Sequence, residues 1–214
     1  MYLGRMLACG RSSTGQVFLY YRVNSRSFKN RVLKSDPGKV AVLPSSRTSS
    51  DFENPYVTYN CCRYSARHCV LANGGQTDPV FEKIMRGAAP RDAIASVLLG
   101  MDYEFDSYNT PRIVLYADAE AQSLFLGIIT ESSLQVEKLV LRPGDLALLS
   151  TNEHNYIERR PAFTGYAVSS LGAAMQYLVD GEPFKNHEHG VLGLTVEVQN
   201  GFAVESRSLS QPSD

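Results

Sequence analysis

Long apolar runs and a strong charge imbalance are both missing from this sequence of 214 residues. No apolar stretch approaches the roughly 18 residues of a membrane-spanning helix. Arg5 interrupts the apolar core that an N-terminal secretion signal would need. Apolar residues make up 43% and the formal net charge is −1, whereas disordered chains have few apolar residues and a large net charge. We therefore expect a folded cytoplasmic protein that does not enter a membrane.

Cysteine is also scarce, and its arrangement argues against disulfides and against zinc. The four cysteines are Cys9, Cys61, Cys62 and Cys69. Adjacent cysteines rarely pair with each other, and the chain has neither a C-x2-C pair nor a matching second half of a zinc site. We expect four reduced thiols that are buried in strands, and no metal site.

The widespread catalytic motifs are absent as well. The chain has no GxxxxGK[ST] phosphate loop, no GxGxxG, no HExxH and no GxSxG. Its charge, however, is unevenly distributed: residues 1–50 carry nine basic residues and one acid, Asp36, which gives +8, and the other 164 residues carry −9. A local positive field on a nearly neutral protein suits a small anionic ligand better than a nucleic acid. The alternative is a solvated strand edge that is protected by Lys and Arg.

Apolar runs bounded by turn signals predict two series of strands and a final hairpin. The predicted strands are residues 2–9, 16–23, 39–43, 55–62, 67–72, 112–117, 123–130, 134–141, 145–150, 191–198 and 202–207. The last two are joined by Asn200-Gly201, the strongest hairpin signal in the chain.

Three helices are expected between these strands. One begins at Asp78-Pro79, with Asp78 as the N-cap; a second begins at Pro90; a third spans residues 166–179. Short loops make the strands mostly antiparallel. We therefore predict an α+β fold, a four-layer αββα sandwich of two mainly antiparallel sheets flanked by helices. It forms a single domain over residues 1–207, with a frayed tail at 208–214.

Glu104 follows the second predicted helix. An apolar stripe with helical spacing precedes it, formed by Ile94, Val97, Leu98, Met101 and Phe105. Glu104 falls on the flank of this stripe, where a core meets a cleft. Periodicity alone favours a solvated glutamate at the rim of the core.

Several polar segments could carry chemistry. Residues 21–31, YRVNSRSFKNR, interleave arginines with serines, and guanidinium and hydroxyl groups are the donors that a phosphate monoester needs. The other polar segments are TYNC (58–61), NGG (73–75) with Asp78, MDYE (101–104) and NTPR (109–112). Asn and Thr in such turns more often cap their own backbone than bind a ligand.

Taken together, these motifs resemble those of one protein family. MYLGR, YRVxSRSFxNR, NPYxxYNC, NGxxTD, RDA, MDYE and NTPRI occur in this order between Met1 and Ile113. This half of the chain is similar to the archaeal-type inosine monophosphate (IMP) cyclohydrolases, and no matching motif is evident after Ile113. The resemblance implies a fold like that of N-terminal-nucleophile (NTN) hydrolases. It also implies the last step of purine synthesis, in which 5-formamidoimidazole-4-carboxamide ribotide (FAICAR) closes to IMP and loses water.

The N-terminus departs from the wider group of NTN hydrolases. Those enzymes expose Cys, Ser or Thr as a processed first residue, whose α-amine serves as the base. Here the second residue is Tyr2, and a bulky residue there normally leaves the initiator Met in place. FAICAR holds both reacting groups on neighbouring positions of one ring, so closure needs no covalent nucleophile, metal or cofactor. We expect the protein to use none.

On this hypothesis the enzyme anchors the ribotide, orients the formyl group and manages protons and oxyanion charge. Glu104 is expected to act as general base or acid, and Tyr59 and Asn60 as donors to the formyl oxygen; Arg22 completes the predicted catalytic set. Substrate binding is expected at Ser25, Arg26, Ser27, Arg31, Asn73, Gly74, Asp78, Asp102, Asn109 and Arg112. The partners are then FAICAR and IMP rather than nucleic acid, and we expect a homo-oligomer.

Three other functions fit parts of the sequence. An amide hydrolase on the same fold would need a nucleophile at a processed N-terminus. A non-catalytic purine-nucleotide-binding protein would use the basic segment for sensing. A metal-dependent hydrolase would draw on the four histidines, His68, His154, His187 and His189.

Overall fold

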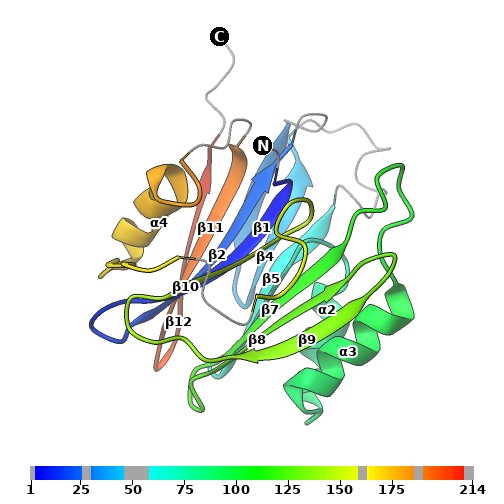
Figure 1. The fold of residues 1–214 in the computed structure, drawn as a ribbon, viewed down its shortest axis with the longest axis horizontal. Helices are drawn as coiled ribbons and strands as arrows, with labels where there is room; N and C mark the ends of the chain where they lie inside the picture. Colours follow the sequence, from blue (N-terminus) through cyan, green and yellow to red (C-terminus); the bar gives the residue numbers. More distant parts are fainter. Residues whose placement is uncertain (1–2, 26–29, 46–57, 159–162, 186–189, 210–214) are drawn as a thin grey trace.

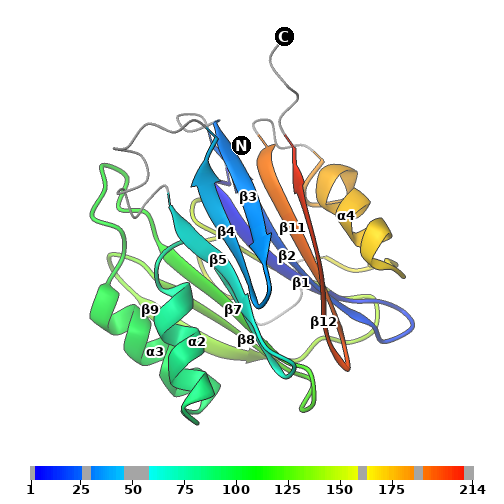
Figure 2. The ribbon, with the colours of Figure 1, turned by 180° about the vertical axis from the view of Figure 1, so that it is seen from behind.

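A computed structural model describes residues 3–25, 30–45, 58–158, 163–185 and 190–209. Within these residues the chain forms two antiparallel sheets that stack face to face, with helices on both outer sides (Figures 1 and 2). This arrangement confirms the predicted α+β sandwich with the layer order αββα.

One sheet has five strands, and its order brings the two ends of the sequence together. The strands lie in the order β10 (Leu146–Ser150), β1 (Arg5–Arg11), β2 (Val17–Asn24), β11 (Gly190–Gln199) and β12 (Gly201–Ser208). Every residue of β2 is buried, because one face of this strand meets the other sheet and the opposite face meets a helix. β12 continues to Ser208, one residue past the predicted boundary, and the N–H of Leu209 donates to Val191 O at 2.9 Å.

The other sheet has seven strands that follow one another in chain order. They are β3 (Arg31–Asp36), β4 (Lys39–Pro44), β5 (Tyr59–Tyr64), β6 (His68–Ala72), β7 (Arg112–Asp118), β8 (Ser123–Ile129) and β9 (Leu134–Leu139). β3 was not predicted. It is an edge strand whose sequence is largely polar and exposed, so its hydrophobic pattern is weak.

Three helices lie within the described part of the chain. α2 (Thr77–Met85) and α3 (Pro90–Met101) pack on the outer face of the seven-stranded sheet, and α4 (Leu171–Asp180) packs on the outer face of the five-stranded sheet (Figures 1 and 2). α3 begins at Pro90, as predicted. None of these helices is long and apolar enough to cross a membrane.

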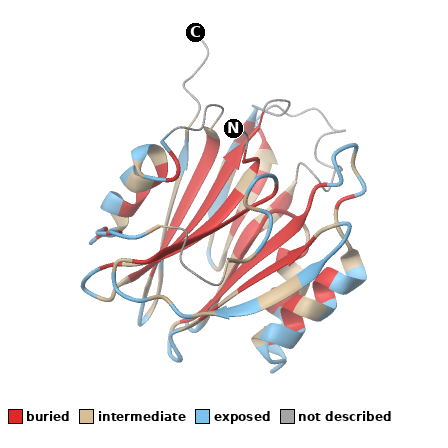
Figure 3. Cartoon of the chain, viewed as in Figure 1, coloured by how far each residue is buried: buried red, intermediate tan, exposed pale blue. Residues whose placement is uncertain are grey.

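The apolar core is divided into three layers, which Figure 3 shows as the buried strands and the inner faces of the helices. The largest cluster fills the space between the sheets, and a second joins the five-stranded sheet to α4. A third joins the seven-stranded sheet to α2 and α3. All four cysteines are buried in strands, which confirms that part of the prediction, and the structure has them as free thiols.

Two predicted helix starts were wrong. Asp78 does not cap α2, because its carboxylate accepts hydrogen bonds from Asn60 and Arg63 instead; the helix begins at Thr77. α4 begins at Leu171 rather than at residue 166. Ser170 caps this helix: its side chain accepts a hydrogen bond from the N–H of Ala173 at 3.2 Å. Residues 166–170 form neither helix nor strand before this cap.

The apolar stripe of α3 also ends earlier than predicted. α3 stops at Met101, and Phe105 is 68% exposed, so it does not extend the buried face. Asp102 ends the helix with a φ of 57°, a left-handed backbone that non-glycine residues rarely adopt. The chain therefore reverses after Met101 and no longer follows the helical periodicity on which the placement of Glu104 was based.

Candidate active site

The polar sequence motifs converge at one end of the sandwich. Because neighbouring strands are antiparallel, β1, β3, β5 and β7 begin at the end where β2 and β6 stop. We call this the site end; it lies near the N label in Figure 1. Segments that are far apart in the sequence, from Arg5 to Arg112, therefore meet there.

Two tyrosines from facing sheets form a buried hydrogen bond near the site end. The hydroxyls of Tyr21 on β2 and Tyr59 on β5 are 2.6 Å apart, and the residues are 0% and 6% exposed. Burial raises the pKa of both phenols, so both are neutral at physiological pH. Tyr59 is thus held as a neutral hydrogen-bond donor.

The charged groups of Arg5 and Arg31 are directed into the layer between the sheets that contains Tyr59. Arg31 faces the other sheet, because it lies two residues before Leu33, which packs in the core between the sheets. Arg5 shares its face of β1 with Leu7, another residue of that core. Burial raises the pKa of Tyr59, and the charges of Arg5 and Arg31 partly offset this effect.

Glu104 reaches the same group of charges from the loop after α3. It is 2% exposed, so the expectation of a solvated rim glutamate was wrong; the reversal at Asp102 turns the side chain inward. Burial raises the pKa of Glu104, and Arg5, Arg112 and Arg31 each oppose that shift. Because Arg5 and Arg31 act on both Glu104 and Tyr59, a carboxylate and a neutral phenol share one cationic environment.

A network of buried amides holds Arg112 beside Glu104. Arg112 Nη1 is 3.5 Å from Glu104 Oε1 and donates to Gln76 Oε1 at 3.2 Å, while Arg112 Nε donates to Asp102 O at 2.8 Å. The amide of Gln76 donates to Asn73 Oδ1 at 2.6 Å. Asn73 in turn accepts from the N–H of Ile113 and donates to Pro111 O.

The backbone at Gly74 passes close to this pair. A methyl group at this position would lie 2.8 Å from Gln76 Oε1, 3.2 Å from Arg112 Nη1 and 3.2 Å from Glu104 Oε1. The absence of a side chain at Gly74 is therefore what permits the close approach of Glu104 and Arg112 to the end of β6. Buried charge, neutral donors and tight packing together suit acid–base chemistry on an anionic substrate.

The sequence of this chain is similar to those of proteins with a named function. The family of IMP cyclohydrolase-like proteins matches residues 2–201. This chain belongs to that family. It is 38% identical to the IMP cyclohydrolase of Methanosphaera stadtmanae, over 89% of this chain and 91% of the relative. Identity is 38% to that of Methanococcus maripaludis strain C6, over 94% and 98%, and 41% to that of Methanocaldococcus jannaschii, over 67% and 69%.

The family predicted from the motifs is thus confirmed, and with it the prediction of an enzyme of the IMP cyclohydrolase type. The sequence motifs supported the resemblance only as far as Ile113, whereas the family match continues to residue 201. In the second half of this chain, strands β7 to β12 complete both sheets, and β7, β8, β10 and β11 are apolar runs that carry few polar motifs by which the family could be recognised.

Arg22 lies on the opposite face of β2 from the Tyr21–Tyr59 pair. Its guanidinium donates to the carbonyls of Leu178 at 2.7 Å and Phe184 at 3.1 Å, and to Asn24 Oδ1 at 3.1 Å. The pKa of Arg22 is lowered to about 10 by burial. The structure therefore does not bring Arg22 together with Tyr59 and Glu104. Its guanidinium instead binds the last turn of α4 and the segment that follows that helix.

Asn60 and Tyr59 point to different layers. Tyr59 packs between the sheets, whereas the amide of Asn60 donates to both carboxylate oxygens of Asp78 on α2, at 3.1 and 2.9 Å. Arg63 also contacts Asp78. Adjacent strand residues project to opposite faces, so Tyr59 and Asn60 do not meet the same ligand atom in this arrangement.

The other predicted binding residues divide between the site end and the surface. Asp102 supports Arg112 through its backbone carbonyl, while Asn109 is exposed and donates to Glu131 Oε2 at 3.1 Å. Ser25 is buried just after β2. Arg26 and Ser27 lie outside the described residues.

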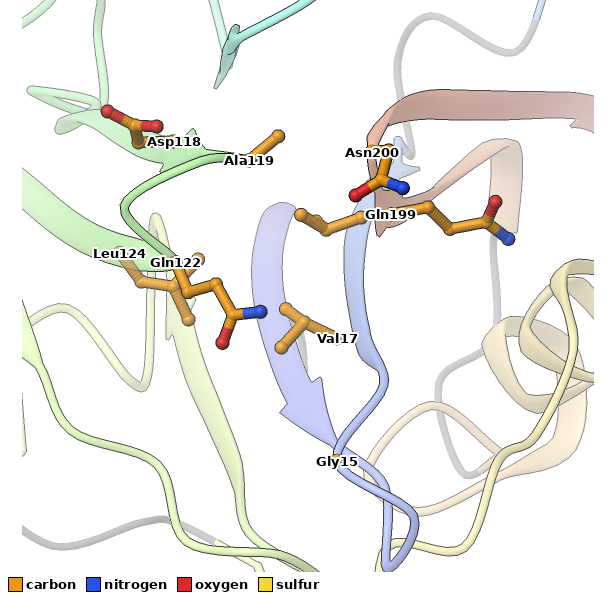
Figure 4. Close-up of a pocket in the computed structure, with 9 residues that line it drawn as sticks. Gly15, Val17, Asp118, Ala119, Gln122, Leu124, Gln199 and Asn200 are labelled. Atoms are coloured by element: carbon orange, nitrogen blue, oxygen red, sulfur yellow. The ribbon is translucent and has the colours of Figure 1, made fainter.

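A cavity of about 260 Å³ opens at the far end of the sandwich (Figure 4). It is lined by Gly15, Val17, Asp118, Ala119, Gln122, Leu124, Val198, Gln199 and Asn200. Its only carboxylate, Asp118, is already bound by Arg67 and by backbone N–H groups of its own turn. The site end is a better candidate for catalysis than this cavity. Glu104, Tyr59 and Arg112 lie at the site end, whereas Asp118 is the single ionisable residue of the cavity lining.

No group of three or more His, Cys, Asp or Glu side chains that could hold a metal ion occurs among the described residues. His68 is bonded to the hydroxyl of Tyr116 at 2.8 Å, and His154 is 3.7 Å from Glu158. His187 and His189 lie outside the described residues.

Sequence reasoning missed three residues of the site: Arg5, Tyr21 and Gln76. Tyr21 and Arg5 could have been found from strand alternation, since each lies on the same face as the apolar residues of β1 or β2 that enter the core between the sheets. Gln76 gave no comparable signal, because its role depends on the distant Arg112.

Proposed function

We propose that this protein closes FAICAR to IMP with release of water. The observation that carries the proposal is that buried Glu104, 3.5 Å from Arg112, lies at the same end of the sandwich as buried Tyr59, which is bonded to Tyr21. Membership of the IMP cyclohydrolase-like family supports the choice of reaction.

The reaction needs one base and one oxyanion donor. As the carboxamide nitrogen attacks the formyl carbon, Glu104 accepts a nitrogen-bound proton and Tyr59 donates a hydrogen bond to the formyl oxygen, which gains negative charge. Glu104 passes this proton to the formyl oxygen, which becomes a hydroxyl group. Glu104 then accepts the proton of the second nitrogen and gives it to the departing hydroxyl group, so that water leaves and the C=N bond of IMP forms. Both nitrogen-bound protons end in the water, and Glu104 ends ionised as it began.

The anionic end of the ribotide requires cations within one substrate length of this pair. We assign phosphate binding to Arg31 and Arg5, because both are directed into the layer that contains Tyr59. Ser25, Arg26 and Ser27 remain predicted contributors on the segment that joins β2 to β3. Arg22 is left out of the catalytic set, since its guanidinium donates to backbone carbonyls under α4.

The remaining expectations accompany this function as proposals. We propose a single domain over residues 1–207 with an NTN-like fold, located in the cytoplasm and assembled as a homo-oligomer. FAICAR and IMP are its proposed ligands, and no cofactor is required, because both reacting groups are on one molecule.

Conversion of FAICAR by chelator-treated protein tests the function directly. The ultraviolet absorbance of the hypoxanthine ring should rise with time, in proportion to the protein concentration. A protein that binds IMP but leaves FAICAR unconverted would instead be a non-catalytic nucleotide-binding protein, and the proposal would be wrong.

The role of Glu104 gives a prediction about pH. Burial raises the pKa of Glu104, so the ionised base is lost at a higher pH than for an ordinary carboxyl group, and kcat should fall as the pH falls through that raised value. Glu104→Gln should lower kcat by about 100- to 10,000-fold and remove this acid limb. Glu120→Gln, at an exposed position of the far end, is the matched control and should keep both kcat and the limb. Near-normal turnover by Glu104→Gln would exclude the base role.

A further inference from the structure

The hydroxyl pair of Tyr21 and Tyr59 can be arranged in two ways. Each phenol has one proton, so only one of the two can donate across the 2.6 Å separation. The direction decides which hydroxyl proton remains available for another acceptor.

The surroundings of the two residues favour one direction. Tyr21 is 0% exposed and packs among the apolar side chains between the sheets. Tyr59 is its only hydrogen-bond partner within the part of the chain that the structure describes. If Tyr59 donated to Tyr21, the proton of Tyr21 would be buried without an acceptor, which is unfavourable.

If Tyr21 donates to Tyr59 instead, the hydroxyl proton of Tyr59 is available to donate to a ligand. Tyr59 lies within the influence of Arg5 and Arg31, the cations that also act on Glu104. Tyr59 is the first residue of β5 at the site end and is 6% exposed, whereas Tyr21 is fully buried. A ligand that binds at the site end can therefore reach the hydroxyl of Tyr59 but not that of Tyr21.

We propose that Tyr21 is a positioning residue that donates its hydroxyl proton to Tyr59, so that the proton of Tyr59 is directed to the oxyanion of the substrate. The inference rests on the proposed function, in which Tyr59 donates to the formyl oxygen. A hydroxyl that accepts one hydrogen bond becomes a stronger donor in the next, so Tyr21 acts on the reaction through Tyr59 without touching the substrate.

The test compares three single variants and one double variant with FAICAR as substrate. Tyr59→Phe should lower kcat by about 100-fold, the usual effect of losing an oxyanion donor. Tyr21→Phe should lower kcat by about tenfold with KM unchanged, since one polarising hydrogen bond is lost and no substrate contact is removed. The double variant should be no slower than Tyr59→Phe alone, because Tyr21 acts only through Tyr59.

Tyr20→Phe is the matched control. Tyr20 neighbours Tyr21 on β2, and its buried hydroxyl bonds to that of Tyr166 on the opposite face of the sheet, away from Tyr59. This variant also removes one buried tyrosine–tyrosine hydrogen bond, so it should lower the melting temperature about as much as Tyr21→Phe while kcat stays normal.

The outcomes separate the inference from the function on which it rests. Failure of the wild-type protein to convert FAICAR would overturn both, and normal turnover by Tyr59→Phe would overturn the role of Tyr59 and the inference with it. A slow Tyr59→Phe beside a normal Tyr21→Phe would overturn the inference alone, as would equal losses of kcat in Tyr20→Phe and Tyr21→Phe. If Tyr21→Phe does not fold, replacement of Tyr21 alone by 3-fluorotyrosine tests the direction. Its more acidic hydroxyl should raise kcat if Tyr21 donates, and a lower kcat would contradict the proposal.

Discussion

Gly74→Ala should disturb the site by placing a single methyl group against Glu104 and Arg112. The new carbon would lie 2.8 Å from Gln76 Oε1 and 3.2 Å from both Arg112 Nη1 and Glu104 Oε1. Gln76 cannot simply swing away, because its amide is fully buried and bonded on both sides by Asn73 and Arg112. Gln76 must therefore shift together with Arg112, to which it is bonded, and Glu104 must move by a few tenths of an ångström.

The cost follows from overpacking. An extra methyl group in a packed site costs about 1–3 kcal/mol, and the reduced freedom of the unfolded chain returns about 0.4–1 kcal/mol. A net loss of about 1–2 kcal/mol corresponds to a melting temperature lower by about 2–8 °C for a chain of this size. Since misplacement by 1 Å can cost about 100-fold in rate, we expect kcat to fall by about tenfold.

Thermal unfolding and steady-state turnover of FAICAR measure these two effects. Gly100→Ala is the control: Gly100 lies in α3, and a methyl group there would meet no atom within 4 Å. Alanine favours helix by up to about 1 kcal/mol over glycine, so this variant should be slightly more stable and fully active. If Gly74→Ala matched the wild type in both melting temperature and kcat, the tight packing of Glu104 against Gly74 would be refuted.

Two further predictions concern residues whose roles the fold separates from catalysis. Arg22→Gln should lower the free energy of unfolding by about 2–4 kcal/mol, because the carbonyls of Leu178 and Phe184 lose a charged donor. KM for FAICAR should stay within about twofold, and a large rise in KM without loss of stability would return Arg22 to the substrate site. Native protein should not react with iodoacetamide, because all four thiols are buried and burial raises the pKa of Cys9 to about 12; rapid loss of activity on alkylation would contradict this.

The fold could be predicted from local patterns because most strands have strong ones. β1, β2, β7 and the β11–β12 hairpin are apolar runs with clear turns, and their short loops already require antiparallel pairing. The elements that were missed or misplaced depend on contacts with distant residues. β3 is stabilised by its pairing with β4 despite a polar sequence, and Asp78 binds Arg63 instead of capping its own helix.

The site was only partly predictable for a similar reason. Residue type and order identified Tyr59, Glu104 and Arg112, but the sequence does not show the chain reversal at Asp102 that buries Glu104. Strand alternation was available, however, and had it been applied to β5 it would have separated Asn60 from Tyr59. The positions that no pattern reveals are those, such as Gln76, whose partner lies on another strand.

The central strand β2 explains why neighbouring residues in this protein have such different roles. Tyr20 and Arg22 face α4, whereas Tyr21, between them, faces the other sheet and bonds to Tyr59. Because both faces of β2 are buried, a shift of register by one residue would place the charge of Arg22 in the apolar layer between the sheets and remove Tyr21 from it. The interactions that fix the register of the fold are therefore also those that place a hydroxyl group, and not a cation, behind Tyr59.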